Sequence, residues 1–480
     1  MEKNITVWFN SPQVKILPRS HMPWGKRESY HVYVAKNSSE GVQVSFMAPE
    51  ARGGFSIEIV GAKECGVKVE LLREMYVSCA GAEHPDPVLP DDGKFDLEKM
   101  RNLTYLINFV TDDDSVAGEH ALKMILKEGG EIYGEYEITL TVWNFSIDRS
   151  APMETSFGVQ RYLLEMEHKS DDPDGLYKKY YDMLLNRYHI CAYSLPYDIL
   201  DERVDEYLND DRVTAFIIPH DVSDDTIRAY YEKLSKNEKW LKKGVFYVVD
   251  EPCNMEAYRN IEAAYNRLEA LFPGHQMVSP FFQEINDNPD VRAVDMLAKY
   301  CKVWCPKAML YKDQWFVDYM RTRDAMGDKS WWYVCWEPLL PYANVFVDME
   351  GFYHRVLFWQ QFLHDVRGML YWSTVYWVYT NPWDSASTVE NLSYYCFGDG
   401  SMFYPGDRVG IDGPVGSLRL EILRYGIDDF YMLRQAEEKF GREWVDEQIK
   451  TVSPNVREYN DDHSMLDKVR VIIGERLSKE

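Results

Sequence analysis

The sequence predicts two domains of different class: a β-sandwich over residues 1–148 and a (β/α)8 barrel over residues 149–480. Eight short runs rich in β-branched and aromatic residues fill the first part, and turn signals such as residues 51–54 and 90–93 separate them. After residues 148–152, strand-like runs alternate with helical runs at intervals of 24 to 37 residues. This spacing is typical of repeated βα units.

The N-terminal domain is expected to support the second domain, since its sequence contains no cluster of catalytic residue types. Its predicted strands cover residues 6–9, 31–35, 42–47, 55–60, 67–72, 103–110, 122–126 and 135–143.

The barrel strands are expected to end near Val159, Tyr193, Ile218, Val249, Pro280, Trp304, Val334 and Tyr371. Helix start signals lie between them, for example Asn254 ahead of a run with apolar residues at helical spacing. An open doubly wound sheet is the competing fold. The sequence lacks both a Gly-x-Gly-x-x-Gly after the first strand and a phosphate loop, which favours the barrel.

The charge composition of the chain restricts the classes of molecule that it can bind. The chain carries 53 basic and 78 acidic residues, for a net charge of −25. So acidic a surface repels phosphate, which argues against nucleic acid and anionic membranes. No run reaches the roughly 18 apolar residues of a membrane helix, and the N-terminus has no signal-peptide pattern, so a cytoplasmic protein is expected. Neither cysteines nor histidines show metal-ligand spacing, and we expect no metal and no cofactor.

Two adjacent acids, Asp250 and Glu251, close the fourth barrel strand and precede Pro252. In a barrel the chemistry lies at the carboxyl ends of the strands. Pro252 favours an extended exit at Glu251, which lets both carboxylates face the barrel mouth. One ionised carboxylate raises the proton affinity of its neighbour, and glycoside cleavage requires a proton donor beside a charge stabiliser. The alternative is a helix-capping Asp beside a solvated Glu.

Tryptophan supplies a second signal, because nine of the fourteen lie between residues 304 and 383. An indole combines a large apolar face with an N–H donor, which suits a sugar ring. Core packing is the alternative. It is preferred for Trp359, whereas a pocket is preferred for Trp372 and Trp377, at or after strand eight. Strand seven places Trp331, Tyr333 and Cys335 on one face and ends in an acid, Glu337, before a proline.

Together these segments resemble glycoside hydrolase family 123, the β-N-acetylgalactosaminidases. The resemblance covers the barrel and rests on the order and spacing of residues 248–252, 332–335, 341–344, 368–372, 381–383, 398–401 and 417–429. It implies an N-terminal β-sandwich ahead of a (β/α)8 barrel. It also implies a retaining mechanism in which the 2-acetamido oxygen of the sugar attacks C1 and forms an oxazolinium ion.

The resemblance assigns Glu251 to protonation of the leaving oxygen and Asp250 to orientation of the acetamido group. Other residues are expected to contact the substrate around this pair. Tyr333 is expected to contact the acetamido carbonyl, with Trp331 and Trp372 as walls of its pocket. Hydroxyl recognition or stacking is expected of Asn344, Trp377 and Trp383. Glu337 departs from the family pattern, and its extra charge is expected to bind a hydroxyl or to alter the substrate. Arg419 and Glu421 are expected to form an ion pair on one helix face.

Three other functions stay open. Glu251 as acid/base and Glu337 as nucleophile would make a two-carboxylate retaining glycosidase. A β-N-acetylglucosaminidase differs only in the choice of sugar, and a barrel that has lost activity would be a carbohydrate-binding protein. The expected partner in every case is a carbohydrate, and the sequence leaves the natural aglycone and the oligomeric state open.

Overall fold

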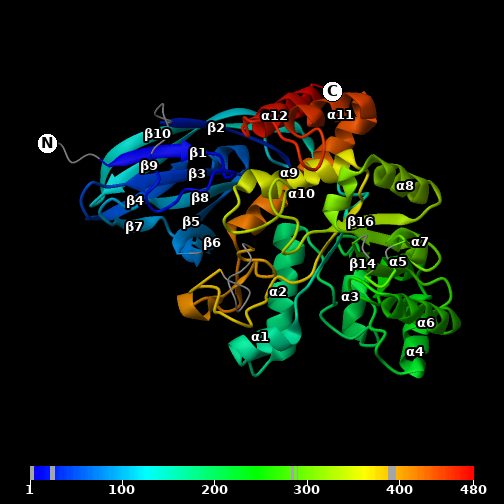
Figure 1. Cartoon of the computed structure of the whole chain (residues 1–480). Coiled ribbons are helices and arrows are strands. Elements are labelled where there is room, and N and C mark those ends of the chain that lie inside the picture. The colour runs from blue at the N-terminus through cyan, green and yellow to red at the C-terminus, as the bar shows by residue number, and fades with distance from the viewer. Residues whose placement is uncertain are drawn as a thin grey trace.

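The computed structural model describes residues 5–21, 28–79, 81–282, 286–288, 290–386 and 396–479. Figure 1 shows the strands of the N-terminal region on one side of the molecule and the remaining strands, surrounded by helices, on the other. The two regions meet along the helices of the C-terminal part.

The N-terminal region contains two five-stranded sheets. The first has the order β1 (Thr6–Asn10), β3 (Ser39–Met47), β8 (Leu103–Val110), β5 (Lys68–Cys79) and β6 (Ala82–Pro90). The second has the order β2 (Ser29–Lys36), β10 (Glu131–Ser146), β9 (Gly118–Glu128), β4 (Arg52–Val60) and β7 (Lys94–Leu97). Each of the eight predicted runs lies largely within one of these strands, whereas β6 and β7 were not predicted. Buried side chains from both sheets share one hydrophobic cluster.

Seven parallel strands form a nearly closed barrel, in the order β11 (Glu154–Phe157), β17 (Gly368–Tyr371), β16 (Lys329–Tyr333), β15 (Val303–Pro306), β14 (Met277–Phe281), β13 (Gly244–Tyr247) and β12 (Phe216–Ile217). The strand expected near Tyr193 is reduced to a single bridge between Ala192 and Phe157. Three backbone hydrogen bonds span the gap: the Phe157 N–H donates to the Cys191 carbonyl (2.9 Å), the Tyr193 N–H to the Phe157 carbonyl (2.8 Å) and the Ile217 N–H to the Tyr193 carbonyl (2.7 Å). The expectation of eight full strands is therefore corrected to seven strands and a one-residue bridge.

Helices connect the barrel strands and extend beyond them. They are α1 (Arg161–His168), α2 (Pro173–Tyr188), α3 (Asp205–Asn209), α4 (Asp224–Leu234), α5 (Glu238–Lys243), α6 (Met255–Leu271), α7 (Ala293–Leu297), α8 (Gln314–Ala325), α9 (Gly351–Leu363), α10 (Leu418–Phe440), α11 (Arg442–Val452) and α12 (Met465–Ser478). Asn254 caps α6 as predicted, because its side chain accepts from the Ala257 N–H at 2.9 Å. Within the described ranges, none of these helices has the length and apolar content needed to cross a bilayer.

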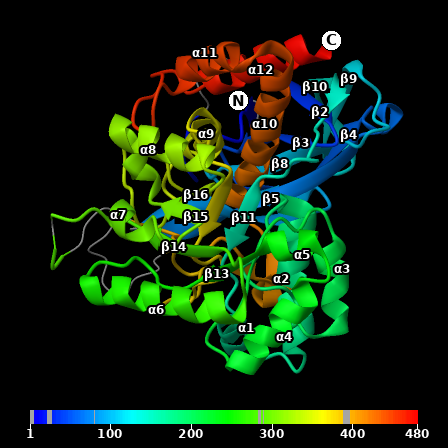
Figure 2. The same ribbon diagram turned by 90° about the vertical axis from the view of Figure 1, so that its right-hand side faces the viewer.

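Helix α10 joins the two regions, lying against α9 and α2 of the barrel side and against β3 and β6 of the first sheet (Figure 2). Every residue from Leu418 to Leu433 is buried, including five charged side chains. A buried charge is tolerated only when it is paired and hydrogen-bonded. The partners of these charges therefore fix how the sheets meet the barrel.

Arg419 and Glu421 do not pair with each other, which corrects the expectation from the sequence. The fully buried Arg419 guanidinium donates to both oxygens of Asp86 on β6 (2.9 and 2.8 Å). It also donates to the carbonyls of Val345 (3.1 Å), Gly398 (2.7 Å) and Ser401. Glu421 instead accepts from Arg187, Tyr188 and Asn108. Residues two apart on a helix point to different faces, so the two side chains find separate partners, and Glu421 also lies 3.7 Å from Arg424 on the same helix.

Replacing Arg419 by Met is expected to destabilise the protein by about 3–5 kcal/mol, because Asp86 is then left buried without its counter-charge. Urea unfolding of the variant and the wild type measures this loss. Glu202→Gln, at an exposed side chain after the bridge segment, serves as the control and should change the free energy of unfolding by less than about 0.5 kcal/mol. A loss below about 1 kcal/mol for Arg419→Met would contradict the assigned pairing.

Candidate active site

A cavity of about 340 Å³ opens at the carboxyl ends of the barrel strands. Asp250 and Glu251, just beyond β13, line it together with Asp399. Six of the other lining residues are aromatic: Tyr247, Tyr333, Trp336, Trp372, Tyr376 and Tyr379. Carboxylates in an aromatic cavity of this size suit a ligand with apolar faces and a hydroxylated rim.

Asp250 is held by the last residue of β13. The Tyr247 hydroxyl donates to Asp250 Oδ1 at 2.7 Å. Desolvation by the cavity walls and the neighbouring charge of Glu251 raise the pKa of the Asp250 carboxyl, although the hydrogen bond from Tyr247 and the charge of Lys307 act in the opposite direction. Oδ1 is therefore fixed in place, which orients the carboxylate in the cavity.

Glu251 takes a backbone conformation that the sequence did not predict. Its φ is +39°, in the left-handed region, rather than the extended exit expected ahead of Pro252. A non-glycine residue in this region costs on the order of 1 kcal/mol or more, which the surroundings must offset. The Glu251 N–H donates to the Pro280 carbonyl on β14 at 3.1 Å. This turn brings the second carboxylate to the same cavity as the first.

The Glu251 carboxylate has two contacts of its own, a tyrosine hydroxyl and a lysine ammonium. Its Oε1 accepts from the hydroxyl of Tyr333, at the end of β16, and lies 3.5 Å from the Nζ of Lys307. Burial of Tyr333 and its closeness to Glu251 raise the pKa of the phenol. Burial alone would lower the pKa of Lys307, but the neighbouring carboxylates of Glu251 and Glu337 raise it overall. Lys307 therefore stays charged beside Glu251.

Asp399 is a third acid of the cavity, and sequence reasoning gave it no role. It is buried, and its two oxygens accept from the Tyr371 hydroxyl (3.1 Å) and the Trp372 indole N–H (3.0 Å). Burial raises the pKa of Asp399 to about 7, despite these hydrogen bonds and the charge of Arg419. Gly400 makes this arrangement possible: its φ is +69°, and a Cβ there would lie 2.3 Å from the Trp372 ring. The one available signal was the glycine-rich segment 398–401.

The raised pKa of Asp399 predicts a pH-dependent difference in stability. The unfolded carboxyl titrates near 3.9, so the folded state binds the extra proton, and its stabilising effect is lost as the pH rises towards 7. Asn does not titrate. The free energy of unfolding of Asp399→Asn, relative to that of wild type, is therefore expected to be on the order of 2–3 kcal/mol higher at pH 8 than at pH 5. Urea unfolding at both pH values measures the difference, and a constant difference would contradict the assignment.

Of the expected substrate contacts, Tyr333 and Trp372 line the cavity together with the two acids. Trp331 does not. It lies two residues before Tyr333 on the same face of β16, so its fully buried ring is one layer deeper in the barrel. Its indole N–H donates to Glu154 at the start of β11 (2.6 Å). The expectation that Trp331 walls the pocket is corrected on this ground.

Trp377, Trp383 and Asn344 also lie outside the cavity lining. The Trp377 indole donates to Ser401 and the Phe403 carbonyl (both 3.1 Å), and that of Trp383 to the Pro405 carbonyl (2.8 Å). Asn344 is fully buried and donates to the carbonyls of Cys335 (2.6 Å) and Pro338 (3.0 Å). These residues support the loops around the cavity. Glu337 is not among the lining residues either, although its neighbour Trp336 is, and its Oε2 accepts from Lys307 at 3.2 Å.

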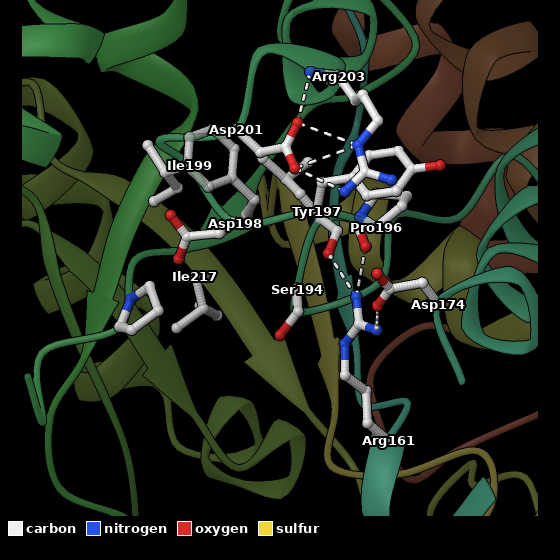
Figure 3. A pocket seen from close by; sticks show the side chains of 13 residues that line it. Arg161, Asp174, Ser194, Pro196, Tyr197, Asp198, Ile199, Asp201, Arg203 and Ile217 are labelled. Carbon is white, nitrogen blue, oxygen red and sulfur yellow. Dashed lines mark hydrogen bonds and ion pairs between the residues drawn. The ribbon is translucent and has the colours of Figure 1, made fainter. Parts of the chain in front are cut away.

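A second, larger cavity of about 450 Å³ lies on the other half of the barrel face, beyond β11 and β12. Figure 3 shows its acids beside basic partners: Asp174 faces Arg161, and Asp201 faces Arg203. Its third acid, Asp198, accepts from the Tyr230 hydroxyl at 2.9 Å. The larger cavity therefore has no pair of adjacent carboxylates for acid–base catalysis. The smaller cavity, which has one, is the candidate active site. Nowhere in the described ranges do three or more metal-ligating side chains gather into a metal site.

Adjacent carboxylates in an aromatic cavity at the carboxyl face of a parallel barrel define the site of a glycoside hydrolase. The family model described as glycoside hydrolase 123, catalytic domain, matches residues 189–436, which is more than half of the chain. The chain belongs to glycoside hydrolase family 123. It is therefore an enzyme that acts on a carbohydrate, as the sequence predicted.

Among solved structures, the chain is similar to a family 123 glycoside hydrolase from Clostridium perfringens, described in a study of glycolipid glycan hydrolysis. The TM-score is 0.70 at 12% identity, over 99% of this chain and 98% of the other. A family 39 glycoside hydrolase from Bacteroides cellulosilyticus matches with a TM-score of 0.32 at 9% identity, over 83% of this chain and 81% of the other, too low to support an argument. A search of curated proteins found no match.

Proposed function

We propose that the protein is an exo-acting β-N-acetylgalactosaminidase that releases terminal β-GalNAc from glycans or glycolipids with retention of configuration. The observation that carries this proposal is the placement of Asp250 and Glu251 in one cavity with different partners. Asp250 is held by Tyr247, whereas Glu251 is contacted by Tyr333 and Lys307. Each carboxylate therefore has its own surroundings, as two different catalytic roles require.

In the proposed reaction, the sugar's own acetamido oxygen attacks C1 and forms an oxazolinium ion, which water then opens. Asp250 accepts a hydrogen bond from the acetamido N–H and stabilises the positive charge that develops there. Glu251 donates its proton to the glycosidic oxygen and later takes one from water. Tyr333 is proposed to donate to the acetamido carbonyl, in exchange for its contact with Glu251, and Trp372 to wall this pocket.

We also propose that residues 1–148 form a β-sandwich support domain and residues 149–480 the catalytic barrel domain. The shared hydrophobic cluster of the two N-terminal sheets supports the first assignment. The contact between Arg419 and Asp86 supports a structural role for the N-terminal region, because Arg419 also binds the loop that carries Asp399.

Side-by-side assays of chromogenic β-GalNAc, β-GlcNAc and β-galactoside test the proposal. We expect the β-GalNAc substrate to be cleaved fastest. Cleavage of the plain galactoside at the same rate would exclude participation of the acetamido group. Preference for β-GlcNAc would keep the mechanism but correct the sugar. Tight inhibition by a thiazoline analogue of GalNAc would further support the oxazolinium ion, which this analogue mimics.

A two-carboxylate retaining mechanism is the second candidate, and one observation favours it. The Lys307 ammonium contacts both Glu251 (3.5 Å) and Glu337 (3.2 Å), which brings the two carboxylates around one cation. Glu337 would then be the nucleophile and Asp250 would have no role. Trapping a fluorosugar on Glu337 would support this candidate, and full activity of Glu337→Gln towards an aryl glycoside would eliminate it.

A further inference from the structure

The segment that follows β16 presents two exposed side chains at the rim of the active-site cavity. Trp336 lines the cavity and is 48% exposed, and the Glu337 side chain is 61% exposed. A large exposed aromatic side chain at the edge of a cavity is a feature of ligand-binding sites.

Hydrogen bonds to buried groups fix the backbone of the segment that carries Trp336 and Glu337. The fully buried Asn344 donates to the carbonyls of Cys335 (2.6 Å) and Pro338 (3.0 Å), on either side of the two exposed residues. The Cys335 N–H closes the turn by donating to the Glu337 carbonyl at 3.0 Å. Side chains on a rigid backbone lose less entropy when a ligand binds, so the segment is preorganised.

Lys307 positions the Glu337 carboxylate. Its Nζ lies 3.2 Å from Glu337 Oε2, and Lys307 itself is buried. The ammonium thus holds one oxygen of an otherwise exposed carboxylate. Ionised carboxylates have lone pairs for several donors, so Glu337 retains capacity to accept hydrogen bonds from a bound ligand.

The contacts of the two catalytic acids show on which side the leaving group must lie. The Glu251 carboxylate is contacted by Lys307, after β15, and by Tyr333 on β16, whereas the Asp250 carboxylate is contacted by Tyr247 on β13. The group that protonates the glycosidic oxygen must be next to the leaving group. Trp336 and Glu337 lie on this side of the cavity, and the larger cavity beyond β12 lies on the opposite side.

We propose that Trp336, Glu337 and Lys307 form a leaving-group subsite that binds the sugar next to the scissile bond. Glu337 accepts hydrogen bonds from hydroxyls of that sugar, and the Trp336 indole covers an apolar face of its ring. The inference rests on the proposed function, since it takes Glu251 as the proton donor. The aglycone must therefore carry hydroxyl groups, because an alkyl chain at the same place could not donate hydrogen bonds to Glu337.

The test compares Glu337→Gln and Trp336→Ala with wild type on two substrates. One is an aryl β-GalNAc glycoside, which has no second sugar. The other is a free oligosaccharide with a terminal β-GalNAc linked to a second sugar. We expect each variant to lower kcat/KM for the oligosaccharide roughly tenfold, mostly through KM, and to leave the aryl glycoside within about twofold. Glu202→Gln, an exposed glutamate on the same barrel face, is the matched control.

The other outcomes overturn the inference in distinguishable ways. Equal losses on both substrates from Glu337→Gln would place Glu337 in the catalytic step. No loss on either substrate would show that no leaving-group sugar contacts this segment. A loss confined to a glycolipid that carries the same two sugars would indicate a lipid contact instead. If wild type cleaves neither β-GalNAc substrate, the proposed function itself fails and the inference fails with it.

Discussion

Replacement of Asp250 by Asn is expected to lower kcat for a β-GalNAc glycoside by roughly 10²–10³-fold. The amide keeps the shape of the side chain and a carbonyl oxygen for the Tyr247 hydroxyl. It removes the negative charge that is proposed to stabilise the developing oxazolinium ion. The loss should therefore lie in kcat rather than in KM. Steady-state kinetics on an aryl β-GalNAc glycoside, at a pH where Asp250 is ionised in wild type, measure it.

Asp198→Asn is the matched control for this experiment. Asp198 also follows a barrel strand position and also accepts from a tyrosine hydroxyl, Tyr230, but it lines the other cavity. Its replacement should leave kcat unchanged. Activity of Asp250→Asn within about tenfold of wild type would show that the charge at position 250 does not stabilise the transition state.

Replacement of Glu251 by Gln is expected to have an effect that depends on the leaving group. General acid catalysis contributes roughly 10²–10⁴-fold when the departing oxygen needs a proton. The variant should lose this factor on substrates with an alkyl or sugar leaving group. A dinitrophenyl leaving group departs without protonation, so its release should fall much less, until the later activation of water limits turnover. Comparison of a series of aryl leaving groups measures this dependence.

The pattern across the series decides the role of Glu251. A loss that grows with the basicity of the leaving group supports proton donation. An equal loss on every member of the series would show instead that Glu251 acts in substrate binding or in the hydrolysis of the intermediate. Tyr333→Phe makes a useful comparison, because it removes the hydroxyl that contacts Glu251 without removing the carboxylate.

The alternation of residue types predicted the eight N-terminal runs because each has a clear β pattern between turn signals. It missed β6 (Ala82–Pro90), which contains prolines at positions 85, 87 and 90. Proline removes a hydrogen-bond donor and argues against a central strand, but β6 is at the edge of its sheet, where proline is tolerated. Edge position is a property of the assembled sheet, so it could not be recognised in the sequence. The missed strand carries Asp86, the partner of Arg419.

In the candidate site, sequence reasoning located the acid pair because two acids at the end of an apolar strand are unusual. The sequence does not distinguish tryptophans that line the cavity from tryptophans that are buried in the core. Trp331, Trp377 and Trp383 occur in the same region as Trp372, and each donates its N–H to a protein acceptor. Which ring faces the cavity depends on its depth along a strand and on loop packing. Lys307 and Asp399 were missed because their importance comes from neighbours distant in the sequence.

The contact between Arg419 and Asp86 has a consequence for dividing the chain. A protein begun at residue 149 would retain Asp250, Glu251 and all the aromatic cavity residues, yet Arg419 would face solvent or an empty space where β6 had been. Arg419 also holds the loop bearing Asp399, and it would lose the carboxylate that now anchors its guanidinium. Excision of the barrel as an independent catalyst is therefore unpromising, and transplantation of this activity to another scaffold would have to carry the sheets along with it.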